Sequence, residues 1–179
     1  PIEEFSKRLS DRIGTQNIKI SNCFLEDFCC TDTFDLVVVS CLLHEIPDKH
    51  TFMRAVLGLM GENSLLYLDV PNALSMHRYL AVSSGYLDDV FSLTQTSKKM
   101  QQSDTVFCTT SLCEFLNKYG LTMTNYGTNF VKFFHHSRMA DLLTGGNLGT
   151  RELDALYDMQ KYFPLNGSEI WAVARKINV

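Results

Sequence analysis

The spacing of apolar residues changes several times along the chain, and each change predicts a new element. In residues 2–13 apolar positions recur every three or four residues, which predicts an amphipathic helix that ends at Gly14. Asn17–Cys23 alternates apolar and polar residues as a strand does, whereas Phe34–Ser40 is a continuous Val-rich run. Such a run is typical of a strand in a parallel sheet that is covered by helices.

The rest of the chain continues to alternate between helical and extended patterns. A helix is expected from Pro47 to about Met60, ended by Gly61, and a buried strand over Ser64–Val70. Further helices are expected over 79–90, 109–119, 137–143 and 150–163, strands over 121–131 and 169–175, a mobile loop over 95–104, and a capping box formed by Ser111 and Glu114. This order predicts a single α/β domain over residues 1–179.

Composition narrows the classes of partner. The 179 residues carry a net charge of −4 and contain no run of five basic residues, which disfavours nucleic acid and anionic membrane surfaces. Apolar runs are far shorter than a membrane span. None of the six cysteines (Cys23, Cys29, Cys30, Cys41, Cys108 and Cys113) lies in a CxxC motif, so we expect reduced thiols and a cytoplasmic location.

Three segments in the middle of the chain carry a family resemblance. Phe34–Val38 reads FDLVV, Leu43–Asp48 reads LHEIPD, and Val70–Arg78 reads VPNALSMHR. In this order they resemble the fourth strand, the following loop and the fifth strand of class I S-adenosylmethionine-dependent methyltransferases. Cys108–Met123 and Gly167–Lys176 resemble the later helix and last strand of that family. The resemblance implies a Rossmann-like sheet with helices on both faces and an antiparallel last strand.

The sequence also departs from this family. The glycine-rich turn after the first strand and the acidic residue that ends the second strand, which hold most of the cofactor in the family, have no counterpart here. We therefore expect the N-terminal strands of the sheet to be absent. Because the chain begins with Pro1, we expect the sequence to lack an N-terminal part of the natural protein; the alternative is a rearranged sheet in which Asn17–Cys23 pairs with Phe34–Ser40.

The resemblance implies a set of contacts to S-adenosylmethionine. The loop after Asn17–Cys23 corresponds to the family's adenine-contacting segment, the end of Phe34–Ser40 lies beside the methionine part, and the next loop lies near the methyl group. The implied cofactor-binding residues are Phe24, Leu25, Glu26, Asp27, Ser40, Cys41 and His44. Phe24 stands where the family has an aspartate, so it can stack on adenine but accepts no hydrogen bond. The alternative is that Glu26 and Asp27 form a solvated turn.

Methyl transfer from a sulfonium needs alignment and, for a protonated acceptor, a base. His77 is the expected general base, and His44 with Glu45 is a second catalytic candidate if the backbone turns to bring the adjacent side chains together. Asn72 and Arg78 are expected to bind the substrate. The alternatives are a capping role for His44 and Glu45 and an ordinary helix-start histidine at position 77.

Two longer segments, residues 79–108 and 134–163, are expected to form a lid or to contact the substrate. His135 and His136 are adjacent and have no further ligand at helical spacing, so no metal site is expected.

Together these features predict methyl transfer from S-adenosylmethionine to an oxygen or nitrogen of a small polar acceptor, with sugar-linked metabolites included. The alternative is a non-catalytic methyltransferase-like interaction module. An apolar surface left by missing strands favours self-association.

Overall fold

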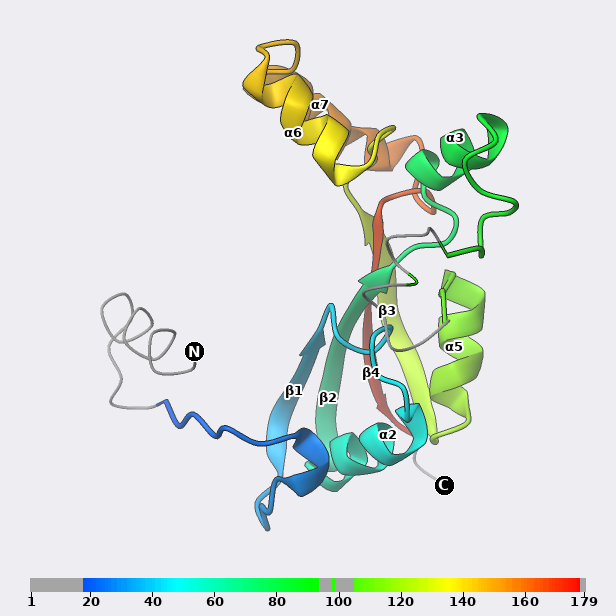
Figure 1. The fold of residues 1–179 in the computed structure, drawn as a ribbon. Coiled ribbons are helices and arrows are strands. Elements are labelled where there is room, and N and C mark those ends of the chain that lie inside the picture. Colours follow the sequence, from blue (N-terminus) through cyan, green and yellow to red (C-terminus); the bar gives the residue numbers. More distant parts are fainter. Residues whose placement is uncertain (1–17, 94–97, 99–104, 178–179) are drawn as a thin grey trace.

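The computed structural model describes residues 18–93, 98 and 105–177 (Figure 1). Its four-stranded sheet has the order β1-β2-β4-β3. β1 (Phe34–Ser40) runs parallel to β2 (Met60–Pro71), and β4 (Glu169–Lys176) runs antiparallel to both β2 and β3 (Leu121–Asn129). The α/β class and the antiparallel last strand are therefore confirmed.

Helices and short 3-10 turns connect these strands. The helices are α2 (Lys49–Gly58), α3 (Met76–Ser83), α5 (Thr109–Asn117), α6 (His136–Thr144) and α7 (Thr150–Asp158), and the 3-10 turns are η1 (Leu25–Asp27) and η2 (Met159–Lys161). α3 begins and ends earlier than the expected 79–90 helix. β2 begins at Met60 and includes Gly61, which the sequence suggested as a helix end.

The expected capping box at Ser111 and Glu114 is wrong by one turn. α5 begins at Thr109, so Cys108 is the N-cap residue and Ser111 occupies the third helical position. The Cys108 backbone N–H donates to Ser111 Oγ at 2.9 Å, and the Ser111 N–H donates to Cys108 Sγ at 3.5 Å. A thiol thus accepts the bond that a Ser or Thr side chain usually accepts at this position.

The strand expected over Asn17–Cys23 is also wrong for its described part, residues 18–23. A strand requires a hydrogen-bonding neighbour, and β1, the edge strand of the described sheet, pairs only with β2. The described residues 18–23 therefore do not pair with β1, as the rearranged sheet would require. The helix expected over residues 2–13, and the loop over 95–104 apart from Lys98, lie outside the described residues.

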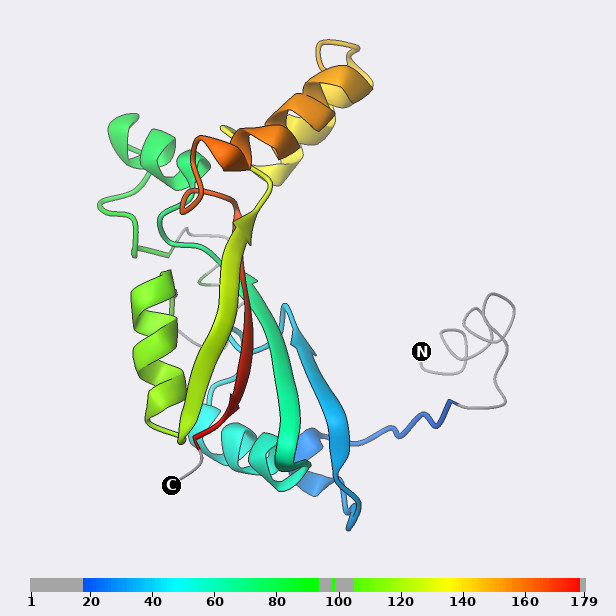
Figure 2. The ribbon, with the colours of Figure 1, turned by 180° about the vertical axis from the view of Figure 1, so that it is seen from behind.

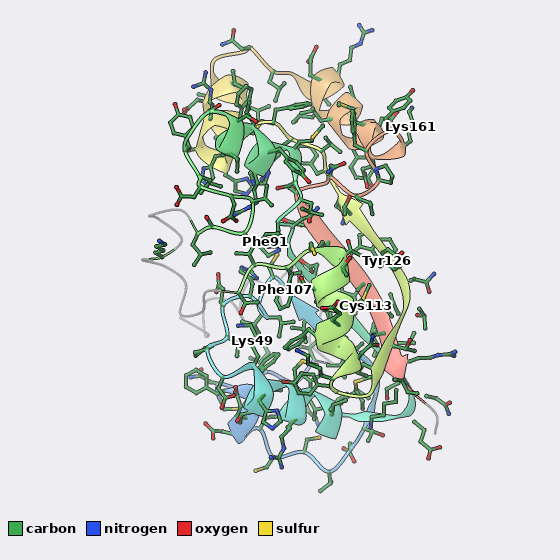
Figure 3. All side chains as sticks on the ribbon, turned by 90° about the vertical axis from the view of Figure 1, so that its right-hand side faces the viewer. Lys49, Phe91, Phe107, Cys113, Tyr126 and Lys161 are labelled. Atoms are coloured by element: carbon green, nitrogen blue, oxygen red, sulfur yellow. The ribbon has the colours of Figure 1, made fainter. Side chains whose placement is uncertain are left out.

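The hydrophobic core lies on one face of the sheet, where α2 and α5 cover the strands (Figure 2). Phe52, Met53 and Val56 of α2 pack there against Leu66 and Leu68 of β2. Leu112 and Leu116 of α5 pack against the same face, and Figure 3 shows α5 in front of the sheet with Phe107 just before its first turn. Burial of these side chains, each worth about 1.5–3 kcal/mol, holds the two helices in place.

The opposite face of the sheet is open in the described part of the chain. Leu36 and Val38 of β1 and Leu65 of β2 are 54, 57 and 41% exposed. Leu36 and Leu65 are register partners and so share this face. The expected helices on both faces are thus seen on one face only within the described residues.

Asn72, which directly follows β2, links the loop before α3 to the loop before β4. Its Nδ2 donates to the carbonyls of Leu165 and Gly167 at 2.9 and 2.8 Å, and its Oδ1 accepts from the Leu74 N–H at 3.0 Å. Its backbone N–H donates to the Ser168 carbonyl at 3.0 Å. Asn72 is 1% exposed, so these bonds fix the path from β2 into α3 against the start of β4.

Gly167 allows this junction to form. A Cβ at position 167 would lie 2.5 Å from the Asn129 carbonyl oxygen and 2.7 Å from the Asn129 nitrogen. Both are backbone atoms of β3, so no side-chain rotation relieves the clash. The close approach therefore requires glycine at this position.

We expect Gly167→Ala to lower the free energy of unfolding by about 1–3 kcal/mol, because the added methyl group forces the backbone of β3 away. The measurement is urea unfolding followed by circular dichroism. Gly58→Ala is the control, since nothing lies within 4 Å of a Cβ at this exposed helical position. This control should raise stability by about 0.5–1 kcal/mol. Equal effects of the two variants would contradict the assignment.

Candidate functional site

A cavity of about 680 Å³ lies beyond the carboxyl ends of β1 and β2. It is lined by His44 after β1, by Pro71 at the end of β2, by α3 with His77, by the segment after α3, and by Phe133, Phe134, His135 and Arg138 after β3. The upper part of Figure 1 shows α3, α6 and α7 beyond this end of the sheet. Open α/β sheets bind ligands at the carboxyl ends of their strands, so the cavity is the candidate site.

Both segments that we expected to contact a substrate contribute to its wall. The first contributes Tyr86, Leu87, Leu93 and Val106, and the second contributes Phe134, His135 and Arg138. The cavity is therefore built largely from connections rather than from strands.

His77 lies in the first turn of α3 and faces the cavity. Its Nδ1 atom is buried and has no hydrogen-bond partner among the described residues. Burial lowers the pKa of His77 to about 3, and the nearby charges of Lys132 and Arg78 act in the same direction. The imidazole is therefore neutral at physiological pH and can accept a proton.

His44 also lines the cavity and is 7% exposed. A turn closed by the Glu45 N–H to the Leu42 carbonyl at 2.9 Å brings the adjacent side chains together, with 3.7 Å between His44 Nε2 and Glu45 Oε1. Burial lowers the pKa of His44, and Glu45 opposes this shift. Asp48 caps α2 by accepting bonds from the backbone of His50 and Thr51, so His44 and Glu45 do not serve as that cap.

The two residues expected to bind substrate play different parts. Asn72 is committed to the loop junction described above, so its assignment as a substrate ligand is corrected to a structural role. Arg78 lines the cavity, and its Nε donates to the Val90 carbonyl at 2.7 Å while one Nη donates to the Ser92 carbonyl. These bonds hold the segment after α3, and no carboxylate of the described residues is bonded to Arg78.

The structure separates the expected cofactor contacts into two groups. Ser40 and Cys41 lie at the carboxyl end of β1, near His44. The turn η1, with Leu25, Glu26 and Asp27, lies beside α2 at the amino end of β1, and Phe24 before it is 79% exposed (Figure 1). Phe24 to Asp27 therefore do not join Ser40 and Cys41 in one site, whereas Ser40, Cys41 and His44 fit a ligand bound at the strand ends.

Cys41 has an unusual environment. Its backbone φ is +48°, and its Sγ donates to Asp69 Oδ2 at 3.0 Å. Partial burial and the carboxylate of Asp69 raise the pKa of the Cys41 thiol to about 12, so this thiol keeps its proton at neutral pH. Cys41, Asp69 and Glu169 form the one group of three potential metal ligands found in the described part of the chain.

Sequence reasoning missed the basic residues after β3. Lys132 is 8% exposed, and its Nζ lies 3.1 Å from His136 Nδ1. The guanidinium of Arg138 lies 5.1 Å from the centre of the Phe134 ring, a cation–π contact at the cavity wall. The signal was the segment KFFHHSR at 132–138, whose histidines we had considered only as metal ligands.

No family model matches the sequence, and the curated proteins give no significant match. Solved structures do match. An S-adenosylmethionine-dependent methyltransferase from Mesorhizobium loti has a TM-score of 0.61 at 12% identity, over 97% of this chain and 77% of its own. Coclaurine N-methyltransferase bound to N-methylheliamine and S-adenosylhomocysteine has a TM-score of 0.54 at 12% identity, over 97 and 55%.

The [4+2]-cyclase SpnF also matches, with a TM-score of 0.57 at 12% identity over 97% of this chain and 61% of its own. The chain spans less than two thirds of the length of several matching structures. Such distant likeness establishes architecture and leaves the reaction to be argued from the site. From the order of its strands and from these matches, the chain has the fold of class I S-adenosylmethionine-dependent methyltransferases.

Proposed function

We propose that the protein transfers a methyl group from S-adenosylmethionine to an oxygen or nitrogen of a small polar molecule bound in the cavity. The observation that carries the proposal is the cavity itself, which lies at the carboxyl ends of β1 and β2 and places His44 and His77 in its wall. The fold and the strand-end location support an acceptor site beside a cofactor site.

His77 is the proposed general base. Its ring lines the cavity and is neutral at physiological pH, so it can accept a proton. A pKa of about 3 also makes it a weak base in the unliganded protein. A bound acceptor that brings negative charge would strengthen this base.

S-adenosylmethionine supplies an electrophilic methyl group on a sulfonium when it is bound. Ser40, Cys41 and His44 are the described residues that we propose to hold it, because they lie together at the end of β1. His44 belongs both to this group and to the cavity wall, so it stands between the cofactor and the acceptor.

One observation favours the second candidate, a non-catalytic interaction module with a methyltransferase-like fold. The expected adenine contacts at η1 lie at the amino end of β1, away from Ser40 and Cys41. A module that no longer binds the cofactor does not need its adenine contacts to lie close to Ser40 and Cys41.

We expect the full product of the gene to bind S-adenosylhomocysteine in isothermal titration calorimetry. His77→Ala should lower the rate of methyl transfer by about 100-fold or more, because a general base contributes this much, and should leave S-adenosylhomocysteine affinity within about twofold. Tyr157→Ala, an exposed position on α7, is the control. Absence of cofactor binding would refute the enzyme and leave the interaction module.

The buried imidazole of His77 also predicts a pH dependence of stability. The folded pKa of about 3 lies below the ordinary value of 6.5, so the unfolded chain binds a proton that the folded protein does not. The stabilisation is complete above pH 6.5 and declines as the pH falls toward 3. Between pH 7.5 and 5.5 the loss from His77 alone is about 1.4 kcal/mol.

Urea unfolding at these two pH values measures the effect. His77→Gln should remove that part of the pH dependence, while His44, whose pKa is also lowered, retains its own contribution. The exposed His50 on α2 provides the control variant, His50→Gln, which should keep the pH dependence of the parent. An unchanged pH dependence in His77→Gln would show that the ring is not held neutral.

A further inference from the structure

The charged side chains that line the cavity, among the described residues, are the two arginines Arg78 and Arg138. The histidines His44, His77 and His135 also line it, and the described lining residues include no aspartate or glutamate. The chain as a whole carries a net charge of −4, so this concentration of basic side chains is a local feature. A cavity lined by one sign of charge and low-dielectric walls attracts ligands of the opposite sign.

Within the described part of the chain, Arg78, Arg138 and Lys132 form no ion pair with a carboxylate. The ion pairs found among the described residues are His44 with Glu45 and Lys161 with Asp158. Arg138 instead contacts the Phe134 ring, and Lys132, 8% exposed, contacts a histidine nitrogen. A lysine is rarely buried without an anionic partner. Burial lowers the pKa of both Lys132 and Arg78, and the negative charges of Glu169 and Asp89 respectively oppose this shift. Neither carboxylate forms an ion pair with the cation that it affects.

The start of α6 adds to this positive region. His135 is the N-cap residue of this nine-residue helix and makes no side-chain cap hydrogen bond, and Arg138 lies in the first turn. The N–H groups of the first turn therefore add their partial positive charge to that of Arg138 at the cavity wall.

Apart from Ser84 and Thr105, the remaining described wall is apolar. Leu80, Leu87, Leu93, Phe133 and Phe134 line the cavity together with the ring of Tyr86. A ligand that satisfies both parts of the wall needs an anionic group and a hydrocarbon body of aromatic or aliphatic character.

We propose that the cavity binds a small amphipathic anion, a carboxylate or phosphate ester with an apolar body, and that this anion is the methyl acceptor: a separate hydroxyl or amino group of the anion takes the methyl group, its proton passes to His77, and S-adenosylhomocysteine is the leaving group. The role as acceptor rests on the proposed function; the binding itself does not. The anionic group lies at Arg138 and the start of α6, and the apolar body lies against Phe133, Phe134 and Leu87. Burial is the main reason for the low pKa of His77, and the anion offsets the smaller part that comes from Lys132 and Arg78.

Three probes of similar shape test the binding directly: 2-naphthoate, 2-naphthyl phosphate and the uncharged 2-naphthamide, each titrated into the full product of the gene by calorimetry at low salt. We expect at least one anion to bind about tenfold or more tightly than the amide. The tighter of the two anions identifies the anionic group as carboxylate or phosphate. Equal affinity of all three probes would overturn the proposal.

A charge-matched pair of variants tests the location. Arg138→Gln should reduce the preference for the anion about five- to tenfold, because it removes a charged donor from the wall. Arg151→Gln removes the same charge at an exposed position on α7 outside the cavity lining and should leave the preference unchanged. Equal losses in both variants would show a general charge effect and overturn the assignment to this cavity.

Nuclear magnetic resonance of the His77 ring gives an independent readout. Saturating anion should raise the pKa of His77 from its value near 3, whereas the amide should not. Anion binding without S-adenosylhomocysteine binding would support the cavity assignment and refute the proposed enzyme. Binding of S-adenosylhomocysteine without a preference for the anion would support the proposed enzyme and refute the cavity assignment.

Discussion

The position of the catalytic candidates depends on the side-chain amide of Asn72. This amide joins the end of β2 to the segment before β4, and the chain enters α3 four residues later. Because His77 and Arg78 lie in the first turn of α3, their direction follows from this junction. A buried amide with three bonds is costly to leave unpaired, so the junction holds the cavity wall more firmly than its loop character suggests.

The same junction connects the site to the sheet. The core lies on one face, under α2 and α5, while the cavity is built beyond the strand ends from α3 and the residues after β3. The strands fix where these segments begin, and hydrogen bonds from Asn72 and Arg78 fix where they go. The charge of the cavity is then a property of the connections, which can change without altering the core.

The apolar pattern predicted β1, α2, β2, α5, β3 and β4, because each buries a continuous or periodic set of side chains. It failed at residues 18–23, since strand formation depends on a partner that local pattern does not reveal. Asn72 was expected to bind substrate, because in a sequence an asparagine after a strand that binds a ligand cannot be distinguished from one that bonds neighbouring loops. Lys132 and Arg138 were missed because their approach to the cavity is set by the turn after β3.

The environment of Cys41 controls how readily its thiol can react with a neighbouring electrophile. A thiolate is a strong nucleophile, and one held next to a methylsulfonium would itself be alkylated. Partial burial, the hydrogen bond from Cys41 Sγ to Asp69 and the surrounding negative charge keep the proton on sulfur. A carboxylate that looks like a potential metal ligand thus keeps its neighbour in the less nucleophilic form, at the strand end where the electrophile is proposed to bind.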